Sequence, residues 1–166
     1  MAKYEFITPQ SLLYDSYCLG KKVLEAEFRP DFIVALWRGG TPVGIALQEF
    51  LAYHNVEADH IAIRTSKYSG IDKAEKTVQV HGLDYLVERV RPEHKVLFVD
   101  DVYHTGLSMK AVFDTLRTKA GHKMPLDIKI ATVYYKPIKN KTKRVPDFYI
   151  HQTNMWLVFP HELLGL

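Results

Sequence analysis

The sequence predicts an α/β fold in which a mainly parallel sheet is flanked by helices, and two observations support this. Short apolar runs at Phe32–Leu36, Val96–Val99 and Ile128–Tyr135 have the length of buried parallel strands and lack helical spacing. The first two runs lead through a short polar loop into a helical pattern, which is the strand–helix order of a parallel sheet. With 166 residues and 47% hydrophobic content, we expect one domain spanning residues 1–166 that buries a substantial core.

The first part of the chain predicts a helix, a strand and a second helix. Thr8 suits an N-cap and Pro9 suits the first turn of a helix that the apolar spacing extends over Ser11–Phe28. The run Phe32–Leu36 follows as a buried strand. A second helical pattern covers Val43–Tyr53.

The middle of the chain is polar between two short strands. Ile61–Arg64 predicts a third strand, whereas Thr65–Thr77 is polar and contains glycine. A polar excursion of this length inside a compact domain is typical of a mobile functional loop. Val78–Val80 alternates like a short strand, and Gly82–Arg89 predicts a brief helix. We expect a small hood or tail subdomain over the strand ends.

The second half repeats the strand–helix order. Val96–Val99 predicts a buried strand that ends at two adjacent acids, and Leu107–Ala120 predicts an amphipathic helix that Gly121 stops. Ile128–Tyr135 predicts a further core strand. The tail begins a last strand at Pro146 and ends in an apolar segment.

Composition excludes several classes of protein. The formal net charge of +3 is too small to indicate a nucleic-acid partner, and the basic run Lys136–Arg144 is interpreted as a solvated loop. Cys18 is the only cysteine, which fits a reducing compartment. No apolar run approaches the roughly 20 residues of a membrane span, and the N-terminal segment lacks the apolar core of a signal peptide. We therefore expect a cytoplasmic protein with no membrane partner.

The segment after Val99 is the candidate functional centre. Asp100 and Asp101 are followed by the small, turn-prone residues His104, Thr105 and Gly106 and then by a helix start. A helix start supplies backbone N–H groups and a positive dipole end beside the two carboxylates. This combination suits a ligand with a phosphate at one end and hydroxyl groups or a bound metal at the other.

Two other strand ends carry cationic residues. Arg38, Gly39 and Gly40 follow the strand Phe32–Leu36; paired glycines allow close backbone approach, and arginine offers a charged donor fork to an anion. Lys136 follows the strand Ile128–Tyr135, at the edge where open α/β sheets bind ligands.

The stretch VLFVDDVYHTGLS, residues 96–108, resembles the phosphoribosyl pyrophosphate (PRPP) signature of type I phosphoribosyltransferases. Four pieces of the chain follow in the family's order: RGG, the polar hood, this signature, and YYKP with the terminal WLVFPHE. The last two pieces resemble the 6-oxopurine subgroup. One signature position departs, because His104 stands where the family usually has Asp.

The resemblance implies transfer of a 5-phosphoribosyl group from PRPP to hypoxanthine, guanine or xanthine in purine salvage, with Mg²⁺ and release of pyrophosphate. It implies a PRPP site made by Arg38, Gly39, Gly40, Tyr68, Asp100, Asp101, His104, Thr105, Gly106, Leu107 and Ser108. It implies base contacts from Lys136, Trp156 and Leu157, and metal ligation by Asp100, Asp101 and Glu162. Arg38 and His104 are the implied catalytic residues, and relatives usually form homodimers or larger homo-oligomers.

Two further features of the family's site match this sequence to different extents. The loop before the basic residue often contains a cis peptide bond, here Trp37–Arg38. The hood carries a Ser-Tyr pair over the reacting sugar, and Tyr68 matches whereas Lys67 occupies the serine position.

Three interpretations of His104 stay open: a working base in place of the usual Asp, a packing or phosphate-facing residue, and a sign of altered or lost catalysis. The third corresponds to a non-catalytic PRPP- or nucleotide-binding regulatory protein. Arg38, Lys136 and Trp156 favour the enzyme, because a phosphate sensor needs no base pocket. The other histidines show no zinc-ligand spacing and are interpreted as surface or loop residues, with only His161 near the site.

Overall fold

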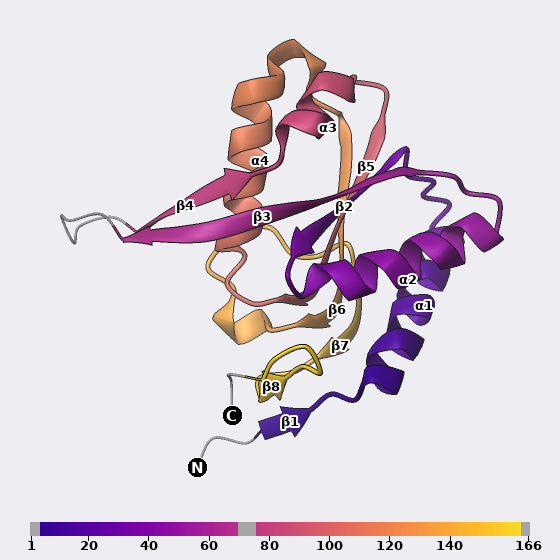
Figure 1. Cartoon of the computed structure of the whole chain (residues 1–166), viewed down its shortest axis with the longest axis vertical. Helices are drawn as coiled ribbons and strands as arrows, with labels where there is room; N and C mark the ends of the chain where they lie inside the picture. The colour runs from indigo at the N-terminus through magenta and orange to yellow at the C-terminus, as the bar shows by residue number, and fades with distance from the viewer. Residues whose placement is uncertain (1–3, 70–75, 164–166) are drawn as a thin grey trace.

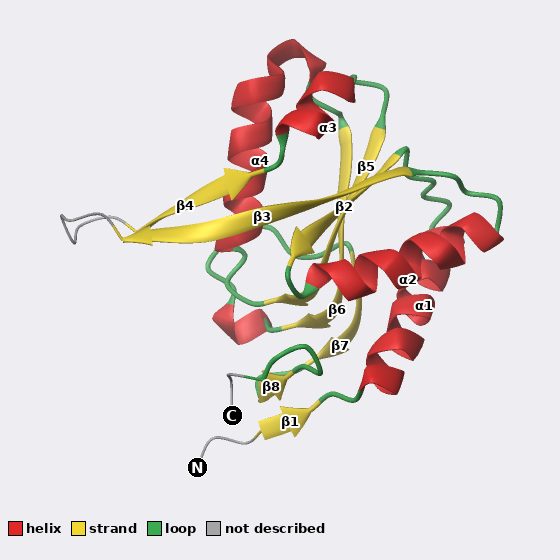
Figure 2. Cartoon of the chain, in the orientation of Figure 1, coloured by secondary structure: helices red, strands yellow, loops and turns green. Residues whose placement is uncertain are grey.

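The computed structural model describes residues 4–69 and 76–163, with the side chains of all but residues 67–69, 76 and 77 (Figures 1 and 2). The helices are α1 (Pro9–Glu25), α2 (Gly40–Tyr53), α3 (Asp84–Arg89) and α4 (Leu107–Ala120), with short 3-10 turns η1 (Gly121–Lys123) and η2 (Pro137–Lys139). The strands are β1 (Tyr4–Phe6), β2 (Phe32–Trp37), β3 (Asp59–Ser69), β4 (Lys76–His81), β5 (Lys95–Tyr103), β6 (Asp127–Tyr135), β7 (Phe148–Gln152) and β8 (Trp156–Val158).

The main sheet confirms the predicted α/β class. Among the described residues it has the strand order β4-β3-β2-β5-β6-β7, and every neighbouring pair is parallel except β3 with β4. The chain leaves β2 towards β3 on one side, whereas β5 lies on the other side. The carboxyl ends of β2 and β5 therefore meet at a topological switch point, where open α/β sheets form ligand crevices.

Strand alternation divides the core into two layers. Ile33 and Leu97 pack with α1 and α2, whereas Val34, Val96 and Phe98 pack with α3 and α4 on the opposite face. Figure 2 shows the two pairs of helices on the two sides of the sheet. Because both faces are covered, these strands read as continuous apolar runs in the sequence.

The helix boundaries follow local chemistry. The Thr8 side chain accepts a hydrogen bond from the backbone N–H of Ser11 at 3.1 Å, as the N-cap prediction requires, and α1 starts at Pro9. It ends at Glu25 rather than Phe28, because Glu27 adopts a positive φ of 56°. The α2 helix begins at Gly40, earlier than the apolar pattern predicts.

Two predicted strand boundaries were also wrong, both where side chains become polar. The polar segment after Arg64 is not a loop along its described length, because β3 continues to Ser69 and pairs with β4 in the register Ser66↔Gln79. These arms project from the body as a ribbon (Figure 1), so neither face requires apolar residues. β5 does not end at the acids either: it continues to Tyr103 by pairing with β6, as in Asp100↔Thr132.

A second, two-stranded sheet joins the two ends of the chain. β1 pairs in parallel with β8 in the register Tyr4↔Trp156, and the N–H of Ile7 donates to the carbonyl of Val158 at 2.9 Å. Figure 1 shows this small sheet below the carboxyl ends of the main strands. It forms the tail subdomain that the sequence predicts, although β1 itself has no clear signal in the sequence. No helix in the described residues is long and apolar enough to cross a membrane.

Phe98 tests the core on the α3 and α4 face. It is fully buried and meets the ring of Phe113 edge-on, with centroids 5.1 Å apart. Phe98→Ala should lower the free energy of unfolding by about 3–5 kcal/mol because it leaves a cavity that the sheet cannot close. Urea unfolding measures this loss. The exposed Leu126, changed to alanine, is the control and should shift stability by less than about 0.5 kcal/mol.

Candidate active site

Two adjoining pockets open at the carboxyl ends of the sheet. The loop pocket, of about 400 Å³, is formed by residues 104–108 with Asp100 and Lys141. The tail pocket, of about 260 Å³, is formed by Arg38, Lys136 and residues of the C-terminal tail. Both include Val102 and His104, so a ligand that fills both would pass these residues.

The two carboxylates serve different pockets. Because β5 continues through them, successive side chains point to opposite faces, and Asp100 lines the loop pocket whereas Asp101 lines the tail pocket. Burial, reinforced by the negative charge of Asp101, raises the pKa of Asp100 well above the ordinary value for aspartate. A cation or hydroxyl donor beside Asp100 would offset both effects.

Asp101 is held on three sides. Its Oδ1 accepts a hydrogen bond from the N–H of Val102 at 2.7 Å, and its Oδ2 lies 3.1 Å from Nε2 of His161. The same carboxylate rests against Gly39, where an added Cβ would overlap it. The residue is 7% exposed, so these partners replace water around a buried acid.

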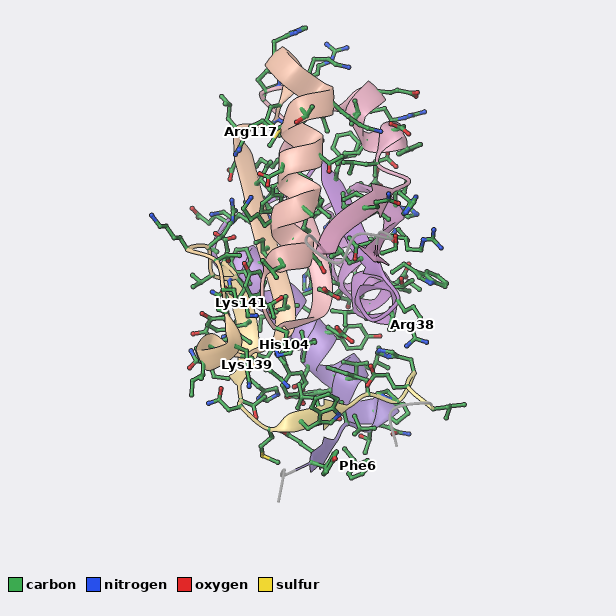
Figure 3. The ribbon with its side chains drawn as sticks, turned by 90° about the vertical axis from the view of Figure 1, so that its left-hand side faces the viewer. Phe6, Arg38, His104, Arg117, Lys139 and Lys141 are labelled. Atoms are coloured by element: carbon green, nitrogen blue, oxygen red, sulfur yellow. The ribbon has the colours of Figure 1, made fainter. Side chains whose placement is uncertain are left out.

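The loop after β2 approaches β5 more closely than any side chain would permit. A Cβ on Gly40 would overlap the carbonyl oxygen of Val99, so the Gly39-Gly40 pair is needed for this contact. The Trp37–Arg38 peptide bond is cis, as the resemblance implies. Arg38 is exposed and lines the tail pocket (Figure 3), beside the face of β5 that carries Asp101.

The candidate anion cradle is the segment from Thr105 to Ser108 at the start of α4, which lines the loop pocket. Gly106 is the N-cap with φ of 75°, and Thr105, Leu107 and Ser108 also line the pocket. The Thr105 hydroxyl accepts a hydrogen bond from the N–H of Leu107 at 3.4 Å. Backbone N–H groups at such a helix start attract phosphate and other anions. Thr105, Gly106, Leu107 and Ser108 therefore all line the loop pocket.

Lys136 reaches the tail pocket from a buried position. It is 8% exposed, and its Nζ donates to the carbonyl of Met155 at 2.7 Å and lies 6.0 Å from the ring centre of Trp156. Burial, with a smaller contribution from the charge of Lys139, lowers the pKa of Lys136 below its ordinary value. Trp156 is 56% exposed and lines the pocket, whereas Leu157 beside it is buried.

Of the remaining predicted site residues, His104 and Glu162 line the pockets, whereas the side chain of Tyr68 is outside the described residues. His104 is exposed at the junction of both pockets (Figure 3). Glu162 lines the tail pocket, and its Oε2 accepts from the N–H of Phe159 at 3.2 Å. No three histidine, cysteine, aspartate or glutamate side chains converge on a metal position within the described part of the chain. Tyr68 lies in β3, and its side chain is outside the described residues.

The sequence prediction missed two residues of the site. His161 was expected near the site but without a role, yet it hydrogen-bonds Asp101 and stacks on Phe159 with centroids 5.3 Å apart. Lys141 belongs to the basic run interpreted as solvated, yet it lines the loop pocket, and its N–H donates to the carbonyl of Thr105 at 3.0 Å. The high number of lysine and arginine residues in that run could have indicated that Lys141 lies at a ligand pocket.

Residues 18–162 match the family model of the phosphoribosyl transferase domain. No curated protein matches this chain at a significant level. Among solved structures, the chain is similar to a purine phosphoribosyltransferase from Pyrococcus horikoshii Ot3, at 27% identity and a TM-score of 0.73 over 98% of this chain and 97% of that one.

Two further structures share the fold at 21% identity. One is a xanthine-guanine-hypoxanthine phosphoribosyltransferase from Helicobacter pylori, with a TM-score of 0.67 over 96% of this chain and 92% of that one. The other is a hypothetical protein from Neisseria gonorrhoeae solved with bound ppGpp, with a TM-score of 0.79 over 99% of this chain and 92% of that one.

Gly106 tests how tightly the anion cradle is packed. Gly106 and Gly82 both have positive φ, 75° and 84°, so alanine at either position adds similar backbone strain. At Gly106 the new Cβ would also lie 2.6 Å from the Tyr103 hydroxyl and 2.7 Å from Oγ1 of Thr142. Gly106→Ala should therefore lose about 1 kcal/mol more unfolding free energy than Gly82→Ala in urea titrations. Equal losses would contradict this packing.

Proposed function

The chain belongs to the phosphoribosyl transferase domain family, and from that premise we propose that it transfers the 5-phosphoribosyl group of PRPP to a 6-oxopurine. The products would be a nucleoside monophosphate and pyrophosphate. The observation that carries the proposal is the pair of adjoining pockets, one with an anion cradle and the other with a buried lysine beside an exposed indole.

The loop pocket suits the 5-phosphate and the ribose. Backbone N–H groups from His104 to Ser108, with the hydroxyls of Thr105 and Ser108, would bind the phosphate. Asp100 lines the same pocket and would accept hydrogen bonds from ribose hydroxyls. Burial and the charge of Asp101 raise the pKa of Asp100, and ribose hydroxyls that donate to its carboxylate would lower this pKa again.

The tail pocket suits a purine with an oxygen at C6. Trp156 offers a flat aromatic surface for stacking, and backbone groups of Leu157 would contact the base edge. Lys136 Nζ would donate to the purine O6. Adenine would bind less well, because its 6-amino group would meet a cationic donor. This argument favours hypoxanthine, guanine and xanthine as a class.

The donor set is compatible with Mg²⁺ supplied together with PRPP. Mg²⁺ prefers oxygen ligands and is usually held by one or two carboxylates plus substrate phosphates. Asp100 and Asp101 would support it directly or through water, and Glu162 at the tail pocket would add an acid. When bound, the ion would stabilise the negative charge that develops on pyrophosphate.

Two side chains would act on the reacting groups. The bond from C1 of the ribose to pyrophosphate breaks while a bond to a purine ring nitrogen forms. Arg38, at the pocket edge with the flanking loop amides, would stabilise the leaving pyrophosphate. His104, at the junction of both pockets, would accept the proton from the purine, because neutral imidazole is an effective base near neutral pH.

We place this reaction in the cytoplasm and in a homodimer or larger homo-oligomer. The single cysteine, Cys18, supports a reducing compartment. Leu13 and Tyr14 on α1 and Ile45 and Tyr53 on α2 are exposed, which supports association through these helices. The oligomeric state of a distant structural neighbour, the Trypanosoma cruzi hypoxanthine phosphoribosyl transferase, is itself a subject of study.

The direct test supplies PRPP and Mg²⁺ with each nucleobase in turn and measures pyrophosphate release. The proposal expects turnover with hypoxanthine, guanine or xanthine and at least about 100-fold lower kcat/KM with adenine and uracil. Turnover with adenine alone would refute the assignment of Lys136.

A non-catalytic PRPP- or nucleotide-binding regulatory protein is the second candidate, and His104 favours it, because the family usually has Asp there. The neighbour from Neisseria gonorrhoeae carries ppGpp, which makes nucleotide binding a use of the same fold. Tight binding of PRPP without turnover of any base would support this candidate over the enzyme.

His104 is tested by its removal and by restoring the family's residue. If His104 is the base, His104→Ala should lower kcat by about 100-fold or more while PRPP affinity changes less than about 3-fold. His104→Asp should recover most of the lost turnover. Steady-state kinetics and PRPP titration measure the two effects. Unchanged kcat in His104→Ala would rule out the base role.

Lys136 is tested with a side chain of similar length and no charge. Lys136→Met should lower kcat/KM for hypoxanthine by about 10- to 100-fold, because a charged hydrogen bond to O6 is lost. PRPP affinity should stay within about 3-fold. Lys139→Met, an exposed lysine three residues away, is the matched control and should retain kcat/KM. Equal losses in both variants would contradict the proposed contact.

A further inference from the structure

A third cavity lies outside the two pockets of the proposed reaction. This α4 groove, of about 470 Å³, runs between α4 and residues 141–144. It borders the loop pocket, because Lys141 lines both. Figure 3 shows Lys141 near His104 and Arg117 farther along α4. Nothing in the proposed transfer reaction uses this groove.

The rim of the α4 groove is cationic. Lys110 and Arg117 lie seven residues apart on one face of α4, and Lys141 and Lys143 face them from the opposite segment. Asp114 pairs with Lys110 and lies 3.8 Å from Arg117, so one acid partly compensates the two helix cations. The side chains of Lys141 and Lys143 make no hydrogen bond or ion pair within the described residues. The rim therefore carries an uncompensated positive charge.

The floor of the α4 groove is apolar and aromatic. Tyr103, Met109 and Phe113 line it and are otherwise buried, at 3%, 3% and 8% exposed. The guanidinium group of Arg144 lies 4.7 Å from the ring centre of Phe113. A cationic rim above an apolar floor suits a ligand with a charged end and a flat, weakly polar end.

Hydrogen bonds within the opposite segment hold the α4 groove open. The side chain of Asn140 accepts from the N–H of Thr142 at 2.9 Å and donates to the carbonyl of Arg144 at 2.9 Å. The Tyr103 hydroxyl lies 3.1 Å from Oγ1 of Thr142 and donates to the Arg144 carbonyl at 3.1 Å. Because these bonds fix the segment without a ligand, binding would require little ordering.

We propose that the α4 groove is a second ligand site, which binds a nucleoside triphosphate with its phosphates on Lys110, Arg117, Lys141 and Lys143 and its base on the apolar floor. The volume of the groove is that of a small-molecule site. A triphosphate matches a rim that carries several cations, and a base matches a floor of aromatic and thioether side chains. This site shares Tyr103, Met109 and Lys141 with the loop pocket, and it differs from that pocket in Lys110, Arg117 and Lys143 on its rim and in Phe113 on its floor.

Isothermal titration of the full chain with ATP tests the site with three variants. Arg117→Glu combined with Lys143→Glu reverses two rim charges and should weaken ATP binding at least 10-fold. Lys139→Glu makes the same charge change in the same basic run outside the groove, and should weaken it less than about 2-fold. Ser108→Glu introduces a negative charge into the loop pocket, and should leave ATP binding to the groove within about 3-fold.

Four results would overturn the proposal. The first is the absence of saturable ATP binding by the unaltered chain at millimolar concentration. The second is equal weakening of ATP binding by Lys139→Glu and by the double variant. The third is loss of binding in Ser108→Glu with retention in the double variant, which would put the nucleotide in the loop pocket. The fourth is equal affinity for inorganic tripolyphosphate, which would leave the apolar floor without a role. Circular dichroism verifies that each variant, changed only at exposed or pocket-lining positions, remains folded.

Discussion

Successive side chains of β5 point to opposite faces of the sheet, and both pockets depend on this alternation. A strand that continued only to Val99 would place Asp100 and Asp101 in a loop, where both carboxylates are free to turn to the same side. Pairing with β6 as far as Tyr135 keeps the backbone extended, so the side chains alternate. One strand thereby supplies one acid to the loop pocket and one to the tail pocket. Any ligand that spans the two pockets crosses β5 at this point, beside Val102.

Two adjacent acids at the end of a buried strand repel each other and lose hydration. The surrounding protein groups compensate Asp101 for this more than they compensate Asp100. Asp101 is compensated within the protein by the N–H of Val102 and the ring of His161. Asp100 accepts from the N–H of Asp101 at 3.0 Å but keeps a raised pKa. Asp101 therefore has partners within the protein and touches Gly39 of the loop after β2, whereas the negative charge of Asp100 is the one that a ligand would stabilise more.

Local sequence patterns predicted the strands that are buried on both faces. They failed for elements and contacts that form only by pairing with residues far away in the sequence. β2 and the core of β5 read as apolar runs because helices cover both faces of the sheet. β1 has three residues and exists because it pairs with β8, about 150 residues away in the sequence, which no local pattern reveals. The same reason explains His161: its partner Asp101 lies 60 positions earlier. Motif residues such as Thr105 were predictable because their chemistry is contained in one strand–loop–helix segment.

Two positions where this chain departs from its family's pattern meet at one pocket. His104 stands where the family usually has Asp, and the terminal segment Pro160-His161-Glu162 resembles a Pro-Trp-Asp/Glu segment of the purine enzymes, with His161 at the position of Trp; both histidines line the tail pocket. Replacing Asp removes one negative charge, and an imidazole on Asp101 screens another, so the pocket presents less negative charge to a bound base. In the proposed reaction a less negative pocket would favour the developing pyrophosphate, because an anion gains more than the neutral purine does when negative charge is removed nearby. If His104 accepts the proton as proposed, it would become cationic in a pocket region that also contains Asp100 and Asp101, and their negative charge would stabilise the imidazolium.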